Sequence, residues 1–131
     1  MSALITNTSP HSVNETVRRL VEALDRRSIT LFARIDHAQG ARAVGLDLPD
    51  ETVLLFGNPQ AGTSLMQEDA RVGIDLPLRM LIWDDDGGTK LGYHDPTQLG
   101  TTYDLRSTAE TLHQMKQLLA QLAAEAIATD G

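Results

Sequence analysis

Two pairs of histidine and aspartate stand near the predicted ends of strands, Asp36-His37 and His94-Asp95. An imidazole that is oriented by a carboxylate can act as a general base. If the two pairs met at one edge of a sheet, their four side chains would also suit zinc or another divalent ion. Neither dipeptide is a metal motif, and Asp95 followed by Pro96 equally suits the start of a turn. We therefore assign no catalytic residue, and the sequence leaves any metal or cofactor unknown.

The loop FGNPQAGTSLMQ, called the FGNP loop below, is the second place where chemistry is possible. It has neither the lysine of a Walker A loop nor the spacing G-x-G-x-x-G, so neither of these two phosphate-binding motifs applies. Gly62 and Thr63 at the start of a helix can present free backbone N–H groups to a small anion. Alternatively, Asn58 and Pro59 form only a turn, and Thr63 or Ser64 caps the helix that follows.

The composition describes an acidic protein without cysteine. Its 131 residues fit one domain, and 41% hydrophobic residues with only 4% aromatics predict an aliphatic core. The net charge of -7 and the presence of only two lysines disfavour nucleic-acid binding, which relies on clustered basic side chains. The first ten residues lack the basic and apolar regions of a signal peptide, and no apolar run reaches the ~18 residues that span a bilayer. We therefore expect a cytoplasmic protein that contacts neither nucleic acid nor membrane.

Hydrophobic periodicity predicts the elements that must position these residues. The resulting order is β-α-β-α-β-α-β-β-α, which indicates a single α+β domain over residues 1–131, with one sheet and helices packed mainly on one of its faces. The run 52–56 is apolar on both faces and so predicts a central strand. The order of the strands is not readable from the sequence. Strands are expected at 3–6, 29–35, 52–56, 78–83 and 89–94, a hairpin turn at 84–88, and helices at 12–27, 38–46, 61–70 and 107–128.

Two capping boxes mark predicted helix starts. Ser12 with Glu15, and Ser107 with Glu110, have the spacing at which a hydroxyl accepts one backbone N–H bond and a carboxylate reaches back to another. The helix that starts at the second box carries an apolar seam with heptad-like spacing, which either packs on the sheet or contacts a second copy. The seam consists of Leu112, Met115, Leu119, Leu122 and Ala126.

Several of these segments together resemble the DUF302 family, small bacterial and archaeal domains with a TT1751-like fold. The resemblance runs from the first predicted helix to about residue 99. Its most specific part is the block in which Phe-Gly-Asn-Pro is followed by Gly-Thr and then by Leu-Met. The matching pieces are Ile35 to Ala38, Ala41 to Leu46, Phe56 to Pro59, Gly62-Thr63, Leu65 to Gln67, Leu76 to Leu78 and Tyr93 to Pro96.

The resemblance implies a compact α+β domain, often dimeric, whose biochemical function is unassigned. The motif residues fall in loops, where a rigid scaffold often carries binding groups. The family pattern usually has asparagine at the position of His94, so a metal site that requires His94 is not the family's general mechanism. Proline is common at the position of Ser64, which argues against a strict role there. The implied ligand cleft lies around Asp36, His37, Asn58, Gly62, Thr63, Tyr93 and Asp95.

The function predicted from the sequence is a non-enzymatic cytoplasmic homodimer that binds a small polar or anionic ligand beside the FGNP loop. One alternative is a dimeric interaction or structural module for another protein, which the seam of the last helix suggests. Another is an enzyme or divalent-metal binder that uses Asp36, His37, His94 and Asp95. Nothing in the sequence names a substrate, a cofactor or a partner other than a second copy.

Overall fold

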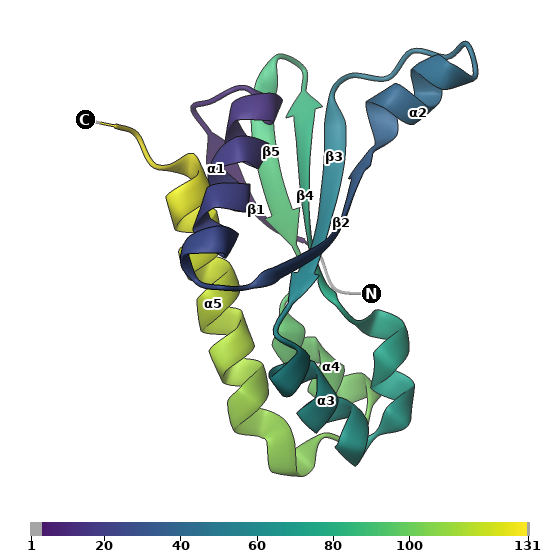
Figure 1. Cartoon of the computed structure of the whole chain (residues 1–131), viewed down its shortest axis with the longest axis vertical. Coiled ribbons are helices and arrows are strands. Elements are labelled where there is room, and N and C mark those ends of the chain that lie inside the picture. The colour runs from purple at the N-terminus through teal and green to yellow at the C-terminus, as the bar shows by residue number, and fades with distance from the viewer. Residues whose placement is uncertain (1–3, 131) are drawn as a thin grey trace.

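The chain folds around one antiparallel sheet, whose strands lie side by side in the order β1-β5-β4-β3-β2 (Figure 1). A computed structural model describes residues 4–130. The strands are β1 (Ile5–Ser9), β2 (Thr30–Asp36), β3 (Glu51–Gly57), β4 (Leu78–Asp85) and β5 (Gly88–Tyr93). The helices are α1 (Val13–Arg26), α2 (His37–Ala43), α3 (Pro59–Glu68), α4 (Leu99–Thr102) and α5 (Ala109–Ile127), with 3-10 segments η1 (Ala70–Asp75), η2 (Pro96–Gln98) and η3 (Arg106–Thr108).

Two long helices cover one face of the sheet. α1 and α5 pack against each other on this face, which confirms the predicted α+β class and the placement of helices (Figure 1). Alternation along β3 turns Thr52, Leu54 and Phe56 toward the helices, where they are buried. α1 packs a stripe of residues spaced three and four apart against them, including Val17 and Leu20, which are both fully buried. The core is aliphatic, as the composition predicts.

A second, smaller core lies beyond the end of the sheet where β3 ends and β4 begins (Figure 1). Residues from α3, η1 and the segment before η3 pack there against the first half of α5, and Leu65 and Val72 are fully buried among them. Leu78, the first residue of β4, packs against both cores. The FGNP loop spans the end of β3, the cap Asn58 and most of α3. Its position is therefore set by the junction of the two cores.

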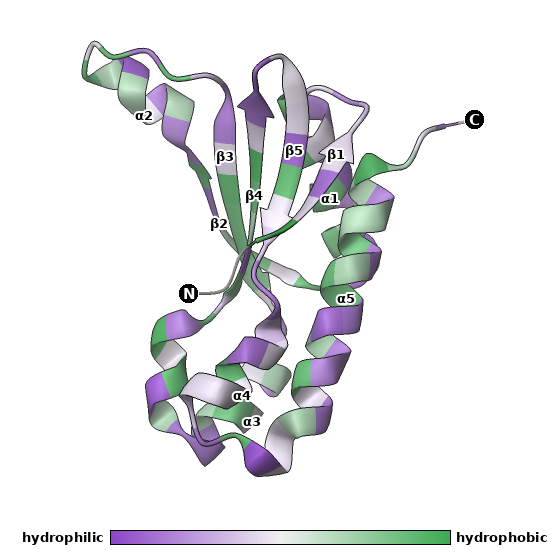
Figure 2. Cartoon of the chain, turned by 180° about the vertical axis from the view of Figure 1, so that it is seen from behind, coloured by the Kyte–Doolittle hydropathy of each residue, from purple (hydrophilic) through white to green (hydrophobic). Residues whose placement is uncertain are grey.

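The central part of the other sheet face carries no helix, and we call it the open face (Figure 2). One row of paired residues crosses it from Ile35 through Val53 and Leu81 to Gly92. The ring of Trp83 lies close above Gly92. A Cβ at position 92 would stand only 3.1 Å from this ring. This close approach explains a glycine inside β5. The open face comprises Val53, Leu55, Arg79, Leu81, Trp83 and Gly92, with Ile35 at its border.

The first predicted capping box forms in part, and the second is wrong. The Ser12 hydroxyl accepts a hydrogen bond from the backbone N–H of Glu15 at 3.0 Å and caps α1, but the Glu15 carboxylate pairs with Arg18 and Arg19. Ser107 instead lies in η3, where its N–H and its hydroxyl both donate to the carboxylate of Glu68. Thr108 donates to the same carboxylate at 2.6 Å. A residue at the end of α3, rather than one within α5, therefore satisfies the polar groups of this turn.

Several element boundaries differ from the predicted ones. α3 begins two residues early because Asn58 is its cap, and α2 begins at His37 because Asp36 is its cap. The first strand begins at Ile5, and residue 3 of the predicted strand lies outside the described residues. No element was predicted at η2 or α4, because both are too short to show a hydrophobic period.

The predicted hairpin turn joins β4 to β5. Asp86 and Gly87 at its centre have φ angles of 54° and 88°, the left-handed pair that a tight two-residue hairpin requires. The carboxylate of Asp84 accepts a hydrogen bond from the Gly87 N–H at 2.8 Å. This acid therefore stabilises the turn.

The apolar seam of α5 packs inside the chain. Its members are at most 7% exposed, and they belong to the main core or to the smaller core. Leu119, Leu122 and Ala126 thus pack against the chain's own sheet, as one of the two interpretations expected, and Leu112 and Met115 pack in the smaller core beyond it. A second copy would need another surface.

Candidate functional site

The FGNP loop borders a hollow of about 420 Å³ between β3, α3 and η1, which we call the FGNP hollow. Gly57, Asn58, Pro59, Gly62 and Thr63 line it from the loop and the first turns of α3. The remaining walls are mostly apolar side chains. They include Phe32, Leu55, Met66, Leu76, Leu78 and Met115. The hollow therefore combines an apolar interior with polar groups at its mouth.

The polar groups of the FGNP loop are largely used to start α3. The Asn58 Oδ1 accepts the Gln60 N–H at 2.9 Å, and the Gly62 N–H donates to the Asn58 carbonyl at 3.1 Å. Thr63 and Ser64 lie within α3, so neither caps it. With these N–H groups already bonded, the helix start has little left to offer the small anion that the sequence suggested. The Asn58 amide and the Thr63 hydroxyl remain exposed at the mouth.

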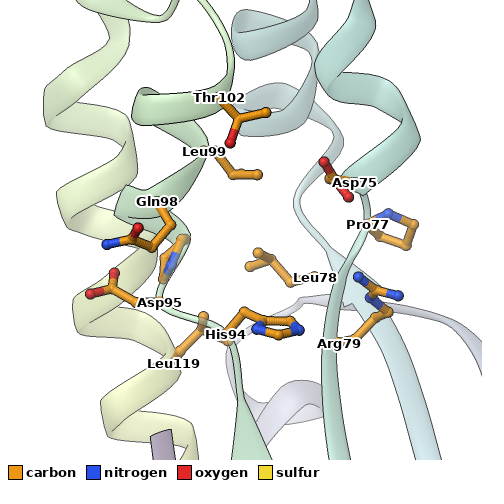
Figure 3. A pocket seen from close by; sticks show the side chains of 11 residues that line it. Asp75, Pro77, Leu78, Arg79, His94, Asp95, Gln98, Leu99, Thr102 and Leu119 are labelled. Atoms are coloured by element: carbon orange, nitrogen blue, oxygen red, sulfur yellow. The ribbon is translucent and has the colours of Figure 1, made fainter. Parts of the chain in front are cut away.

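A second, smaller hollow of about 220 Å³ also borders the segment 77–78, and we call it the polar hollow (Figure 3). Arg79 comes from β4 and His94 follows β5, and Figure 3 shows the His94 ring extending toward the Arg79 side chain. Gln98 and Thr102 line the hollow from η2 and α4. The apolar part of the lining includes Leu78, Leu99 and Leu119.

Asp95 borders the polar hollow, but its carboxylate is already bonded. Oδ1 accepts the N–H and the hydroxyl of Thr97 at 2.9 and 2.7 Å, and Oδ2 lies 3.0 Å from the Nζ of Lys116 on α5. Burial raises the pKa of Asp95, but these contacts together outweigh burial and hold that pKa below its ordinary value. The neighbouring Tyr93 is buried, and burial, together with the charge of Asp95, raises the pKa of its hydroxyl.

The meeting of the two His/Asp pairs would require β2 and β5 to finish at the same end of the sheet, and this condition is not met. Neighbouring strands are all antiparallel, so β2 and β5 run in opposite directions and finish at opposite ends of the sheet. The Asp36 carboxylate accepts the Gln39 N–H at 2.9 Å as the cap of α2. His37 and His94 border one broad hollow of about 460 Å³ on the open face, one at the end of β2 and the other at the end of β5. Within residues 4–130, no three side chains of His, Asp or Glu lie close enough to hold a metal ion.

The residues of the predicted ligand cleft are thus divided among three neighbouring hollows rather than gathered in one. Asn58, Gly62 and Thr63 border the FGNP hollow, His37 and Tyr93 border the hollow on the open face, Asp95 borders the polar hollow, and Asp36 borders none of the three.

Sequence reasoning missed three polar residues of the polar hollow, Arg79, Gln98 and Thr102. Arg79 left one signal, because it is the single charged residue within the otherwise apolar run 78–83. A charge inside such a run is unusual for a buried strand and so marks a position that faces solvent or a ligand.

A family model and a solved structure point to one family. The model of the family described as "Domain of unknown function DUF302" matches residues 5–122. The crystal structure of an uncharacterized conserved protein DUF302 from Bacillus stearothermophilus has a TM-score of 0.84 with this chain at 25% sequence identity. That likeness covers 94% of this chain and 97% of the Bacillus chain.

Curated relatives of this chain include Brucella proteins named as channels. The fluoride-specific ion channel FluC 1 of Brucella suis biovar 1 is 42% identical over 105 residues, which cover 79% of this chain and 41% of the relative. FluC 1 of Brucella abortus biovar 1 and FluC 2 of Brucella melitensis biotype 1 match at the same identity over 39% of their length. The chain thus spans about two fifths of the length of these relatives. Among residues 4–130, no helix combines the length and the apolar character needed to cross a lipid bilayer.

Proposed function

This chain belongs to the DUF302 family, and we propose that it is a non-enzymatic ligand-binding domain whose site is the FGNP hollow. The observation that carries the proposal is the hollow itself, about 420 Å³ in volume and lined from several elements, with the most specific sequence block of the chain at its mouth. A volume of this size falls within the range of small-molecule sites, which are mostly apolar with a few polar groups that orient the ligand.

The lining of the FGNP hollow narrows the chemistry of the ligand. Phe32 and Met66 border it while 53% and 39% exposed, so apolar surface is open to an incoming molecule. Polar contacts are limited to the mouth, where the Asn58 amide and the Thr63 hydroxyl are exposed. The polar ligand expected from the sequence therefore becomes a small molecule with an apolar body and one polar end, the latter held by Asn58 and Thr63.

Gly62 offers a way to fill the FGNP hollow without disturbing the fold. A Cβ at this position would stand 3.8 Å from Leu76 Cδ1 and 4.0 Å from Met66 Cε, which is ordinary contact. Gly62→Leu is expected to occupy the hollow. Gly62→Ala adds only the Cβ and favours the helix slightly, so it is the matched control. The probe is 4-fluorobenzyl alcohol, whose ¹⁹F NMR signal reports binding directly.

We expect the wild-type protein and Gly62→Ala to bind the probe saturably, and Gly62→Leu to bind it at least tenfold more weakly because its side chain takes the place of the aromatic ring. Thr63→Val should weaken binding several-fold by removing one hydrogen bond at the mouth, a loss on the order of 1 kcal/mol. Circular dichroism shows whether the variants are folded. Equal binding by all of these proteins, or no saturable binding by the wild type, would refute the proposed site.

The proposal includes a cytoplasmic homodimer, in which the second copy covers the open face. Since the seam of α5 is buried in the chain's own core, the interface must lie elsewhere. The apolar residues of the open face are partly buried, and exposed ones adjoin them along the arm of β2, α2 and the segment after α2, where Ile35 is 44%, Val44 73% and Leu46 64% exposed. Contiguous apolar surface of this kind marks interaction sites, and two copies of one such face can pair about a two-fold axis.

The names of the channel relatives suggest a second function for this domain, beside an ion channel. Their names describe fluoride-specific ion channels, and this chain is 42% identical to the 105 matched residues. On that ground we propose, as a second function, an accessory domain that acts beside a channel of this kind. Sodium fluoride in the same ¹⁹F experiment, with sodium chloride as control, tests whether the ion itself is a ligand. Saturable broadening of the fluoride signal would support this function, and a signal unaffected by the protein would exclude direct fluoride sensing.

A further inference from the structure

The polar hollow contains a group of side chains that the proposed function does not use. Arg79, His94, Gln98 and Thr102 line it, and none of these four side chains forms a hydrogen bond or an ion pair with another group in residues 4–130 (Figure 3). His94, Gln98 and Thr102 belong to one continuous segment that runs from the end of β5 through η2 into α4, and Arg79 comes from β4. The fold thus brings the unpaired polar groups of this segment and one arginine of a strand to one small hollow.

Both acids at the polar hollow, in contrast, already have partners. Asp75 accepts a hydrogen bond from the Tyr103 hydroxyl, and that bond, together with burial, raises the pKa of Tyr103. Asp95 is bonded to Thr97 and turned toward α5, where it pairs with Lys116. All the groups left open to a ligand can donate a hydrogen bond, and Arg79 adds a permanent positive charge.

The free guanidinium of Arg79 contrasts with most arginines of this acidic chain. Of the nine arginines in the sequence, six form ion pairs with carboxylates. Arg34, Arg42 and Arg79 form none within the described residues. Of these three, only Arg79 borders any of the hollows described above, and it lies between the polar hollow and the hollow on the open face. In a protein of net charge -7, an unpaired arginine at a cavity provides a site of opposite sign for an anion.

We propose that the polar hollow binds a small carboxylate. The planar guanidinium of Arg79 matches a carboxylate with two parallel hydrogen bonds, and His94, Gln98 and Thr102 are placed to bond its remaining lone pairs. The volume of about 220 Å³ limits the ligand to a small molecule, and the leucines of the lining accept a short alkyl chain. One permanent cation near the carboxylate of Asp75 favours a monoanion over a dianion such as phosphate.

The test titrates ¹⁵N-labelled protein with sodium propionate and follows the backbone amides by NMR. We expect saturable shifts at Gln98 and Thr102, with a dissociation constant that rises at least tenfold in Arg79→Met. Arg42→Met is the matched control, because Arg42 is also exposed and unpaired but borders none of the three hollows. Thr102→Val replaces one hydroxyl by a methyl group and should weaken binding several-fold. It provides the test if Arg79→Met does not fold.

The same titration can also show that the polar hollow is not a carboxylate site. Unchanged affinity in both Arg79→Met and Thr102→Val, or no saturable shift in the wild type, would overturn the site. Equal shifts with propylammonium would also overturn it, because a cation cannot use the guanidinium. Retention of propionate binding in Gly62→Leu would show that the carboxylate site is independent of the FGNP hollow, so either proposal can fail while the other stands.

Discussion

Leu54 and Leu55 are neighbours on β3, yet they lie on opposite faces of the sheet with different surroundings. Leu54 is fully buried beneath α1 and α5, whereas Leu55 lies on the open face and is only partly buried. The same contrast is found on β4, where Met80 and Ile82 are fully buried and Leu81 and Trp83 are partly exposed. The chain's own helices therefore bury one face of the sheet, and they leave the central part of the other, largely apolar face uncovered (Figure 2).

This contrast shows which part of the apolar pattern serves folding and which part is left for binding. Apolar surface that the chain covers itself contributes to the stability of the monomer. Apolar surface that stays open contributes little until a ligand or another protein covers it. The three hollows all lie on or beside the uncovered side of this contrast, at the open face or at the junction with the smaller core.

The largest expected effect compares the two leucines directly. Leu54→Ala should lower the free energy of unfolding by roughly 3 kcal/mol, because it leaves a cavity in a closed core. Leu55→Ala removes the same atoms from a half-covered site and should cost less than about 1.5 kcal/mol. Urea unfolding at protein concentrations low enough to keep the chain monomeric measures both. Equal costs in the monomer would contradict the view that the open face is uncovered.

The sequence predicted the covered side well. Amphipathic helices and an alternating strand carry a periodic signal, so α1, β3, β5 and the buried seam of α5 were predicted with errors of a few residues. The second capping box failed because a capping box is a local pattern, and the partner that wins, Glu68, is 39 residues away from Ser107. The order of the strands depends on such distant contacts too, and no local pattern encodes it.

The candidate site was predicted less well for the same reason. Asp36, Asn58 and Asp95 drew attention as polar residues near strand ends, and all three proved to cap helices or 3-10 turns. Residues with short polar side chains are favoured at such caps, so the composition of a cap imitates that of a binding loop. Arg79 gave only the weak signal of a charge in an apolar run, because its setting depends on η2 and α4.

A charge placed in the middle of the open face tests whether a second copy covers that face. Leu81→Glu should weaken self-association at least tenfold, about 1.4 kcal/mol or more, because the carboxylate would have to be buried against the second copy. The stability of the monomer should change much less than in Leu54→Ala. Light scattering over a dilution series measures the association. Trp83, the only tryptophan of the chain, reports by its fluorescence whether the open face becomes covered.

Gln117→Glu is the control for this experiment, since it adds the same charge at an exposed position on α5. It should leave self-association unchanged. A Leu81→Glu protein that associates as strongly as the wild type would remove the open face from the interface. The arm of β2 and α2 would then be the next surface to examine.

The smallest expected effect concerns the junction of β5 with η2, where the pKa of Asp95 is lowered by its partners. A carboxylate with a lowered pKa stabilises the folded state above its unfolded pKa of about 3.9, and this contribution is lost as the pH falls through the folded value. Asp95→Asn retains an oxygen that can accept the Thr97 N–H and removes only the charge paired with Lys116. We therefore expect a loss of up to about 1 kcal/mol at pH 7 that shrinks toward zero near pH 2.

Urea unfolding of the wild type and Asp95→Asn between pH 2 and pH 7 measures this difference. Asp85→Asn, at the exposed end of β4 and outside the ion pairs of the described residues, makes the same charge change and should show no comparable trend. A difference for Asp95→Asn that stays constant with pH would mean that the side chain acts through its shape and hydrogen bonds alone. In that case the ion pair with Lys116 would not hold the Asp95 carboxylate toward α5. The carboxylate could then turn toward the polar hollow and repel an anion bound at Arg79. The pH experiment therefore tests the electrostatics of the polar hollow as well as the stability of the fold.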